Sequence, residues 1–254
     1  MAKRPFSSAE HALGRLVSGV GNDVQGNQAR TLTELTYARL RRDIVEGHLV
    51  SGSKLRIEHL REQYGVGAGT LREALTRLVS DALVTAEGQR GFRVAPMSLN
   101  DLKDLTRLRV QIEIEALRLS IRHGDQVWRE RLEQAFQALS SLETPITGET
   151  RPAWEEANMQ FHEALLAGHG SEWTTRVLRL LARHGERYRS YAIGLRDRHR
   201  DVHAEHEEIY RYAFSGQEAR AALALEAHIW ATPQLLIQAL RDGRADFPAS
   251  DRSP

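Results

Sequence analysis

Residues 60–95 decide the fold of this chain: LREQYGVGAGTLREALTRLVSDALVTAEGQRGFRVA. A short apolar segment meets a Gly-Val-Gly turn at 65–67, and the segment after it has leucines at helical spacing. Two β-prone stretches, 83–86 and 92–95, then flank a loop that contains Gly and Arg. The order helix, tight turn, helix, hairpin is typical of a winged helix-turn-helix, a unit whose second helix enters the DNA major groove.

Composition limits the class of protein. The chain has 254 residues, of which 41% are apolar, and it has no cysteine, so disulfides and thiolate metal sites are excluded. No run of 18 apolar residues is present, and the N-terminus has no apolar signal segment. These features predict a cytoplasmic protein that does not enter a membrane.

The charge balance does not by itself indicate DNA. The net charge is +1, and residues 31–97 hold ten Lys and Arg against eight Asp and Glu. A DNA-binding protein of this composition must gather its positive charge locally.

The chain divides into two domains with flexible ends. Residues 1–30 are rich in Ser, Gly, Asn and Gln and predict a mobile arm with one short helix near 10–20; an ordered cap on the domain is the alternative. Residues 31–97 form the winged helix-turn-helix, with helices at about 32–46, 57–64 and 68–81 before the hairpin.

The second domain, residues 98–240, is predicted to be an all-helical bundle, so the fold class is mostly α. Ser98-Leu-Asn-Asp101 reads as a capping box that opens its first helix. The polar end of the chain, 241–254, is predicted to be a flexible tail. The six expected helices are roughly 99–122, 125–143, 152–168, 171–192, 197–215 and 217–240.

The second helix of the motif should turn its leucines inward and a polar face toward DNA. Gly69 and Thr70 stand at its N-terminal end, where backbone N–H groups favour a phosphate. Arg72, one turn later, can reach a base edge or a phosphate. A solvated face without function is the alternative. The candidate DNA contacts are Arg56, Gly69, Thr70, Arg72, Arg77, Gln89 and Arg90.

The sequence TLREALTRLVSDALVTAEGQRGFRVA resembles the signature of GntR-family transcription regulators, and the helical part resembles the FCD ligand-binding domain of their FadR-type branch. The resemblance covers about residues 31–240. Within the family it is nearest to the carbon-starvation-induced, glutarate-responsive group. This nearer resemblance is carried by Lys54-Leu55-Arg56, Leu71–Leu75, Arg90-Gly91-Phe92-Arg93-Val94 and Thr232-Pro233.

Two positions depart from the family pattern. Ala68 stands where an Arg or Lys is usual before the recognition helix, and Glu58 stands where an Arg often begins the preceding helix. Two basic anchors for phosphate or a base are therefore missing from the usual pattern. The resemblance implies a homodimer that binds palindromic operator DNA.

A histidine pattern in the helical domain indicates a metal. Asn158 and His162 share a helical face at i and i+4, while His206 and His228 stand on two later helices. Three imidazoles and an oxygen donor are a plausible metal set, although a lone histidine on an apolar face is more often a core residue. Nearby His203 could face the same pocket, but it is expected at the surface.

The family resemblance supports the metal. Metal-binding FCD domains have a D-x-x-x-H motif, then E-H, then a late His; Asn158 replaces the usual Asp and leaves the ion near +2. Zinc suits this set, and nickel or another divalent ion is the alternative. Glu205 should point away from its neighbour His206.

These features together predict a ligand-responsive transcription regulator and not an enzyme. A small carboxylate, such as a glutarate-like dicarboxylate, is the expected effector, and it should release a repressor from a catabolic operon. Arg109, Arg183 and Arg187 are the candidate effector-binding residues, with surface salt bridges as the alternative. The rival functions are a metal-dependent helical enzyme and a sensor of the metal itself.

Overall fold

The computed structural model describes residues 31–143, 146, 149–193, 195 and 200–247, without the side chain of Gln89. The arm predicted at 1–30, with its short helix, lies outside the described residues, as does the tail from residue 248. Of the helices in the described ranges, none combines the length and apolar composition that a bilayer span requires.

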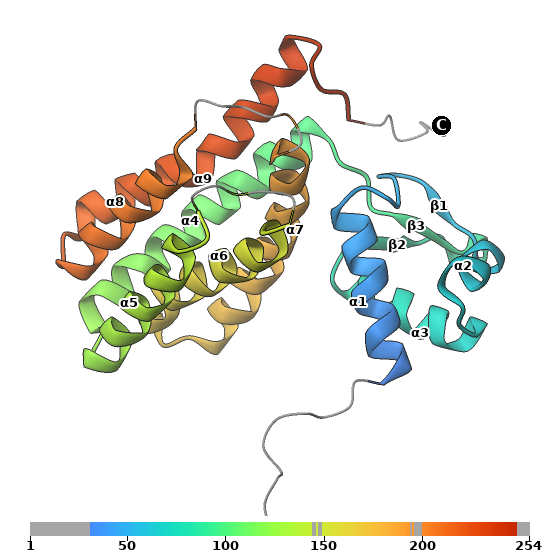
Figure 1. Ribbon diagram of the computed structural model, residues 1–254, viewed down its shortest axis with the longest axis horizontal. Helices are drawn as coiled ribbons and strands as arrows, with labels where there is room; N and C mark the ends of the chain where they lie inside the picture. Colours follow the sequence, from blue (N-terminus) through green and yellow to red (C-terminus); the bar gives the residue numbers. More distant parts are fainter. Residues whose placement is uncertain (1–30, 144–145, 147–148, 194, 196–199, 248–254) are drawn as a thin grey trace, which may run out of the picture. The chain divides into compact units, whose positions relative to one another are not determined.

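The first elements form a winged helix-turn-helix with a small sheet (Figure 1). They are α1 (Leu32–Val45), β1 (Lys54–Leu55), α2 (Ile57–Tyr64), α3 (Ala68–Ser80), β2 (Val84–Ala86), the 3-10 helix η1 (Gly88–Arg90) and β3 (Phe92–Val94). The sheet order is β1-β3-β2, and both pairings are antiparallel. The expected order of elements is confirmed. Strand β1 was not expected, because it has two residues and pairs far along the chain.

The turn between α2 and α3 depends on glycine. Gly65 has a φ of 68°, in the left-handed region, and its N–H bonds to the last turn of α2, which therefore ends there. Leu71, Leu75 and Leu78 of α3 are fully buried in one apolar cluster with Leu40 of α1. The opposite side of α3 is thereby left to solvent.

The helical domain follows as six α-helices within the described residues, as the sequence predicts. They are α4 (Leu99–His123), α5 (Gln126–Ser140), α6 (Arg151–Leu166), α7 (Glu172–Ile193), α8 (Val202–Phe214) and α9 (Glu218–Arg241), with the 3-10 helix η2 (Ala167–His169) after α6. Helix α8 begins later than expected, because the Asp201 side chain accepts the backbone N–H of Ala204 at 3.0 Å.

The capping box predicted at Ser98 and Asp101 is half formed. Ser98 Oγ accepts the backbone N–H of Asp101 at 3.1 Å and so begins α4. The Asp101 carboxylate does not return to Ser98 but accepts a hydrogen bond of 2.5 Å from the Tyr188 hydroxyl of α7. The second half of the box therefore connects α7 to the start of α4.

Helix α4 organises the bundle, since it contacts α6, α7, α8 and α9. Figure 1 shows α8 and α9 side by side along the bundle, and these two helices are also in contact. The apolar core includes Leu117, Leu132, Phe161, Leu165 and Ile209, all fully buried.

Candidate functional site

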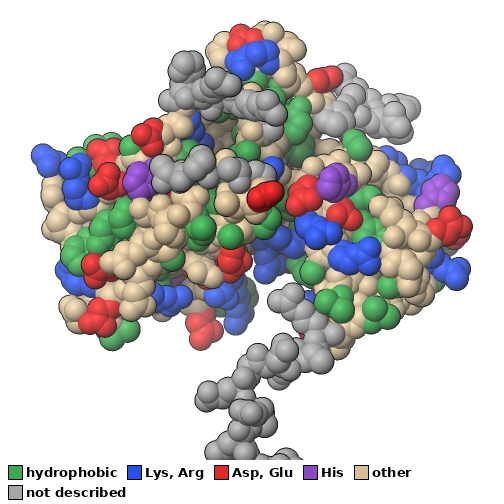
Figure 2. All heavy atoms as spheres, in the orientation of Figure 1, with side chains coloured by type: hydrophobic (Ala, Val, Ile, Leu, Met, Phe, Trp, Pro, Cys, Tyr) green, Lys and Arg blue, Asp and Glu red, His purple; other side chains and the backbone are tan. Residues whose placement is uncertain are grey.

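The predicted DNA contacts of α3 share its solvent face. Arg72 and Arg77 are exposed, and Gly69 and Thr70 lie in the first turn. Backbone N–H groups of a first turn have no intrahelical partner, so this end of α3 suits a phosphate. Figure 2 shows Lys and Arg mixed with Asp and Glu on the face in view, as the small net charge leads us to expect.

The two arginines of α3 differ in what already contacts them. The Arg77 guanidinium lies over the Tyr37 ring of α1, with 4.6 Å between Cζ and the ring centroid. Within the described residues, Arg72 has no hydrogen bond or ion pair from its guanidinium. Arg72 is therefore the side chain of α3 most available to a base edge.

The wing is the hairpin formed by β2, η1 and β3. Arg90 is exposed there, at the end of η1, and Arg56 is exposed just before α2. The Gln89 side chain lies outside what the structure describes. Arg93, which sequence reasoning did not select, donates from Nε to Glu87 at 2.7 Å and also donates to a backbone carbonyl. Arg93 therefore stabilises the hairpin.

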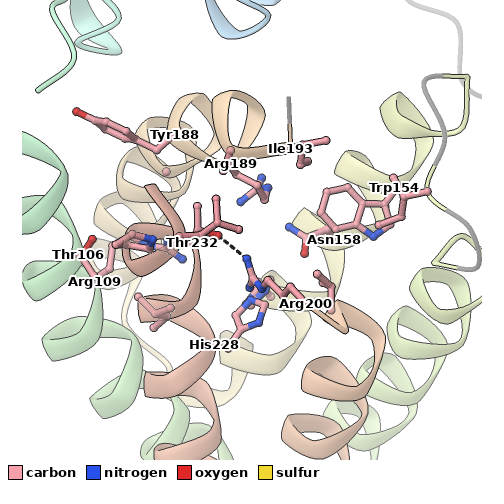
Figure 3. A pocket seen from close by; sticks show the side chains of 18 of the residues that line it. Thr106, Arg109, Trp154, Asn158, Tyr188, Arg189, Ile193, Arg200, His228 and Thr232 are labelled. Atoms are coloured by element: carbon pink, nitrogen blue, oxygen red, sulfur yellow. Dashed lines mark hydrogen bonds between the residues drawn. The ribbon is translucent and has the colours of Figure 1, made fainter. Parts of the chain in front are cut away.

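A cavity of about 970 Å³ lies in the helical domain, lined by α4, α6, α7, α8, α9 and the segment before α6. Figure 3 shows Asn158, Arg189 and Arg200 with their polar ends toward the same space. This volume is within the range of small-molecule sites.

Three histidines meet beside this cavity, one each from α6, α8 and α9. The ring centroids are 5.6 Å apart for His162 and His206, 5.1 Å for His162 and His228, and 4.7 Å for His206 and His228. One ring nitrogen of each lies within 4.8 Å of the other two. The structure thus brings together the three histidines selected from the sequence.

Hydrogen bonds leave nitrogen atoms of this cluster available. His206 Nδ1 is 2.6 Å from Glu143 Oε1, and His228 Nδ1 is 2.8 Å from Glu205 Oε2. A carboxylate accepts, so each Nδ1 donates and each Nε2 is left with a lone pair. Among the described residues, the buried atoms His206 Nε2 and His162 Nδ1 have no hydrogen-bond partner. A bound divalent ion would satisfy such atoms.

The protonation state also suits a metal. Burial lowers the pKa of His162 and of His228 well below the ordinary value, and the positive charge of neighbouring histidines and of Arg109 lowers both further. Both imidazoles are therefore neutral near neutral pH, which is the form that binds a metal.

Asn158 completes the predicted donor set. It is 4% exposed, stands one turn before His162 on α6, and lines the same cavity. Three imidazoles, which carry no charge as metal ligands, and an amide oxygen fit a divalent ion but offset none of its charge.

Of the three arginines predicted for an effector, Arg109 lines this cavity. Arg187 lies elsewhere: it is buried, and its Nη2 donates to the Ala95 carbonyl at 2.7 Å. Arg183 pairs with Asp81 at the end of α3. Arg183 also lines a second cavity of about 610 Å³, which shares Arg109, Asn158, His162 and Arg189 with the first.

Sequence reasoning missed two arginines of the main cavity, Arg189 of α7 and Arg200 just before α8. Helical periodicity is the signal for Arg189, since Gly185, Tyr188 and Ala192 line the cavity from the same face. Arg200 stands outside the helices and carries no periodic signal.

Two further side chains were expected in other surroundings. His203 was expected at the surface, but it lines the cavity, with Nδ1 3.0 Å from Glu143 Oε2. Glu205 was expected to point away from its neighbour His206. It contacts His228 on α9, because a side chain that points away from its neighbour on one helix can reach an adjacent helix.

A winged helix-turn-helix followed by a helical domain with a ligand-sized cavity is the architecture of a DNA-binding transcription regulator. Residues 32–94 match the family described as "Bacterial regulatory proteins, gntR family", and residues 104–231 match the FCD domain. The chain belongs to the GntR family of transcription regulators, in the branch with an FCD domain.

Individual relatives are also named as transcription regulators. The HTH-type transcriptional regulator BphR of Paraburkholderia xenovorans is 42% identical over 79% of this chain and 83% of its own length. The HTH-type transcriptional repressor GlaR of Escherichia coli is 33% identical over 82% of this chain and 97% of its own. These relatives are regulators and not enzymes.

Solved structures share the fold. A GntR-family regulator of Pseudomonas syringae is 26% identical, with a TM-score of 0.50 over 94% of this chain and 100% of its own. The E. coli protein McbR/YncC has a TM-score of 0.66 over 83% of this chain and 99% of its own, at 18% identity.

Proposed function

We propose that this regulator represses a catabolic operon as a homodimer and leaves its operator when a small dicarboxylate binds at a metal in the helical domain. The observation that carries the proposal is a cavity where three histidines with available nitrogens stand beside three arginines. The proposal includes a domain division near residue 97 and operator contacts through α3 and the wing.

The donor chemistry supports a divalent metal held by Asn158, His162, His206 and His228. Neutral, desolvated imidazoles bind zinc well, and nickel is the main alternative. When bound, such an ion supplies a positive centre with room for a carboxylate oxygen.

The arginines alone do not make the cavity attractive to an anion. Arg109, Arg189 and Arg200 donate to Glu113, Glu155 and Glu205 at 2.7, 2.6 and 2.8 Å. These charges cancel in pairs, whereas a divalent ion adds charge that the imidazoles and amide leave uncancelled. A carboxylate should therefore bind the metal-loaded protein much more tightly than the stripped protein.

Arg109 is the best placed residue for the far carboxylate of such a ligand. Its Nε is bonded to Glu113, and within the described residues its two terminal nitrogens have no hydrogen-bond partner. A ligand held by the metal at one end and by this guanidinium at the other would make charge-assisted hydrogen bonds at both. Glutarate is the first candidate, on the resemblance to the glutarate-responsive group.

Calorimetry tests the proposal. C4–C6 dicarboxylates and monocarboxylates of matched length are titrated into zinc-loaded and into chelator-stripped protein. We expect heat from a dicarboxylate with the loaded protein and little with the stripped protein. Tight binding of an uncharged ligand, with no heat from any carboxylate, would overturn the assignment.

A second readout separates the remaining alternative. Operator affinity is measured on the stripped protein, on the zinc-loaded protein, and on the loaded protein with dicarboxylate. We expect only the last addition to weaken DNA binding. A change on metal loading alone would make the ion the effector.

A further inference from the structure

Glu143 is a buried carboxylate that contacts the histidine cluster through His206. It lies in the segment before α6, and its side chain is 0% exposed. Its Oε1 accepts from His206 Nδ1 at 2.6 Å and from Trp154 Nε1 at 3.2 Å, and its Oε2 is 3.0 Å from His203 Nδ1. Burying a carboxylate in this way costs free energy unless the charge is hydrogen-bonded and paired with a positive charge.

The second carboxylate behind the histidines differs in its partners. Glu205 contacts His228 Nδ1, but it also receives two hydrogen bonds from Arg200, at 2.9 and 2.8 Å. Its negative charge is therefore cancelled. Within the described residues, no Lys or Arg pairs with Glu143.

The donor set in front of Glu143 is short of negative charge. Asn158, His162, His206 and His228 are all neutral donors, so an ion among them keeps both of its charges. A divalent ion in a buried site is stabilised by a nearby anion, even one that does not touch it.

We propose that Glu143 is a positioning residue of the metal centre: it turns His206 Nε2 toward the ion and supplies the negative charge that Asn158 does not. This inference rests on the proposed function, because it assumes that the three histidines hold a metal.

The hydrogen bond between His206 and Glu143 supports this role. A hydrogen bond from Nδ1 to a carboxylate fixes the imidazole orientation and raises the basicity of the opposite nitrogen.

The test measures zinc affinity by competition with a chromophoric chelator. Glu143→Gln keeps the size of the side chain and removes its charge. We expect it to bind zinc about 10–100-fold more weakly, the usual effect of losing such a partner. Glu156→Gln, an exposed change on α6, is the matched control and should leave zinc affinity unchanged.

A rescue separates charge from structure. Adding Asn158→Asp to Glu143→Gln should restore most of the zinc affinity, and in the parent chain Asn158→Asp should change it less. The Co²⁺ spectrum of each variant reports ligand geometry, and the melting temperature of the stripped protein reports any general loss of stability. If Glu143→Gln does not fold, Asn158→Asp and Glu143→Asp in the parent chain still test the charge.

The outcomes are distinct. If the parent protein binds no zinc, the proposed function fails before this inference is reached. If the parent binds zinc and Glu143→Gln binds it equally well, Glu143 has no role in the metal centre. A loss that Asn158→Asp does not reverse would overturn the charge compensation.

Discussion

At the scale of single residues, Arg72 should have the clearest effect on operator recognition. It is exposed on α3 and has no partner among the described residues, whereas Arg77 is already stacked on Tyr37. If Arg72 grips a base, Arg72→Ala should lose about 1–3 kcal/mol, concentrated at one position of each half-site. Fluorescence anisotropy on operators with single base changes, at several salt concentrations, measures this.

The matched control is Arg107→Ala, which removes the same charge from an exposed position on α4. It should leave operator affinity nearly unchanged. Equal losses from both variants would mean that only overall charge matters, and an Arg72→Ala protein as tight as its parent would remove Arg72 from the interface.

The histidine cluster makes a second prediction at this scale. His162→Ala/His206→Ala removes two of three imidazole donors and should abolish stoichiometric zinc, measured by elemental analysis of untagged protein. His59→Ala/His123→Ala changes two exposed histidines and should retain the metal. Equal metal content in the two variants would show that zinc binds elsewhere.

The histidines could be selected from the sequence because each stands at helical spacing among apolar residues, and the family resemblance pointed to the same three positions. Glu143 could not. It stands outside the helices, and its contacts with His203 and His206 depend on packing across about sixty positions of sequence. Arg187 was selected for its charge, but its orientation on α7 depends on contacts that the pattern does not contain.

At the scale of elements, helix existence was predictable because it is local. Apolar periodicity, Gly65 and the Ser98 cap fix where helices begin and end. Strand β1 was not predictable, since its two residues become a strand only by pairing with β3. The capping box at Ser98 is incomplete because of a similar long-range contact. The hydroxyl of Tyr188, on a helix distant in sequence, donates to the carboxylate of Asp101.

Helix α7 supplies the element-scale prediction. Gly185 faces Arg109 in the cavity wall, and a Cβ there would lie 3.0 Å from Arg109 Nη1. Gly185→Ala should gain about 0.5–1 kcal/mol of helix propensity and displace the flexible guanidinium. We expect a higher melting temperature for the apo protein together with weaker dicarboxylate binding by calorimetry.

The opposite directions of these two effects are the informative feature. A general packing defect would lower both stability and affinity. Unchanged dicarboxylate affinity in a well-folded Gly185→Ala protein would remove Arg109 from the effector site.

At the scale of the whole molecule, helix α7 contacts both the cavity and the DNA-binding elements. On α7, Arg189 lines the cavity, while Arg187 donates to the Ala95 carbonyl just after β3 and Arg183 pairs with Asp81 just after α3. A ligand that shifts α7 therefore has a physical route to the DNA-binding elements. Such a route transmits a signal only if the ligand favours one arrangement over another.

Thermodynamic reciprocity gives the final prediction. If the dicarboxylate weakens operator binding, operator DNA must weaken dicarboxylate binding by the same factor, on the order of 5–150-fold for a typical coupling of about 1–3 kcal/mol. Zinc-loaded protein is titrated with dicarboxylate with and without saturating operator, and operator is titrated with and without dicarboxylate. The control is Arg72→Ala, whose operator affinity should be reduced.

At an operator concentration too low to saturate the Arg72→Ala protein, the operator should leave the dicarboxylate affinity of that variant unchanged. Two unequal factors in the parent protein would mean that a further equilibrium, such as dimer dissociation, takes part. Two factors of one would mean that this ligand is not the effector, however tightly it binds.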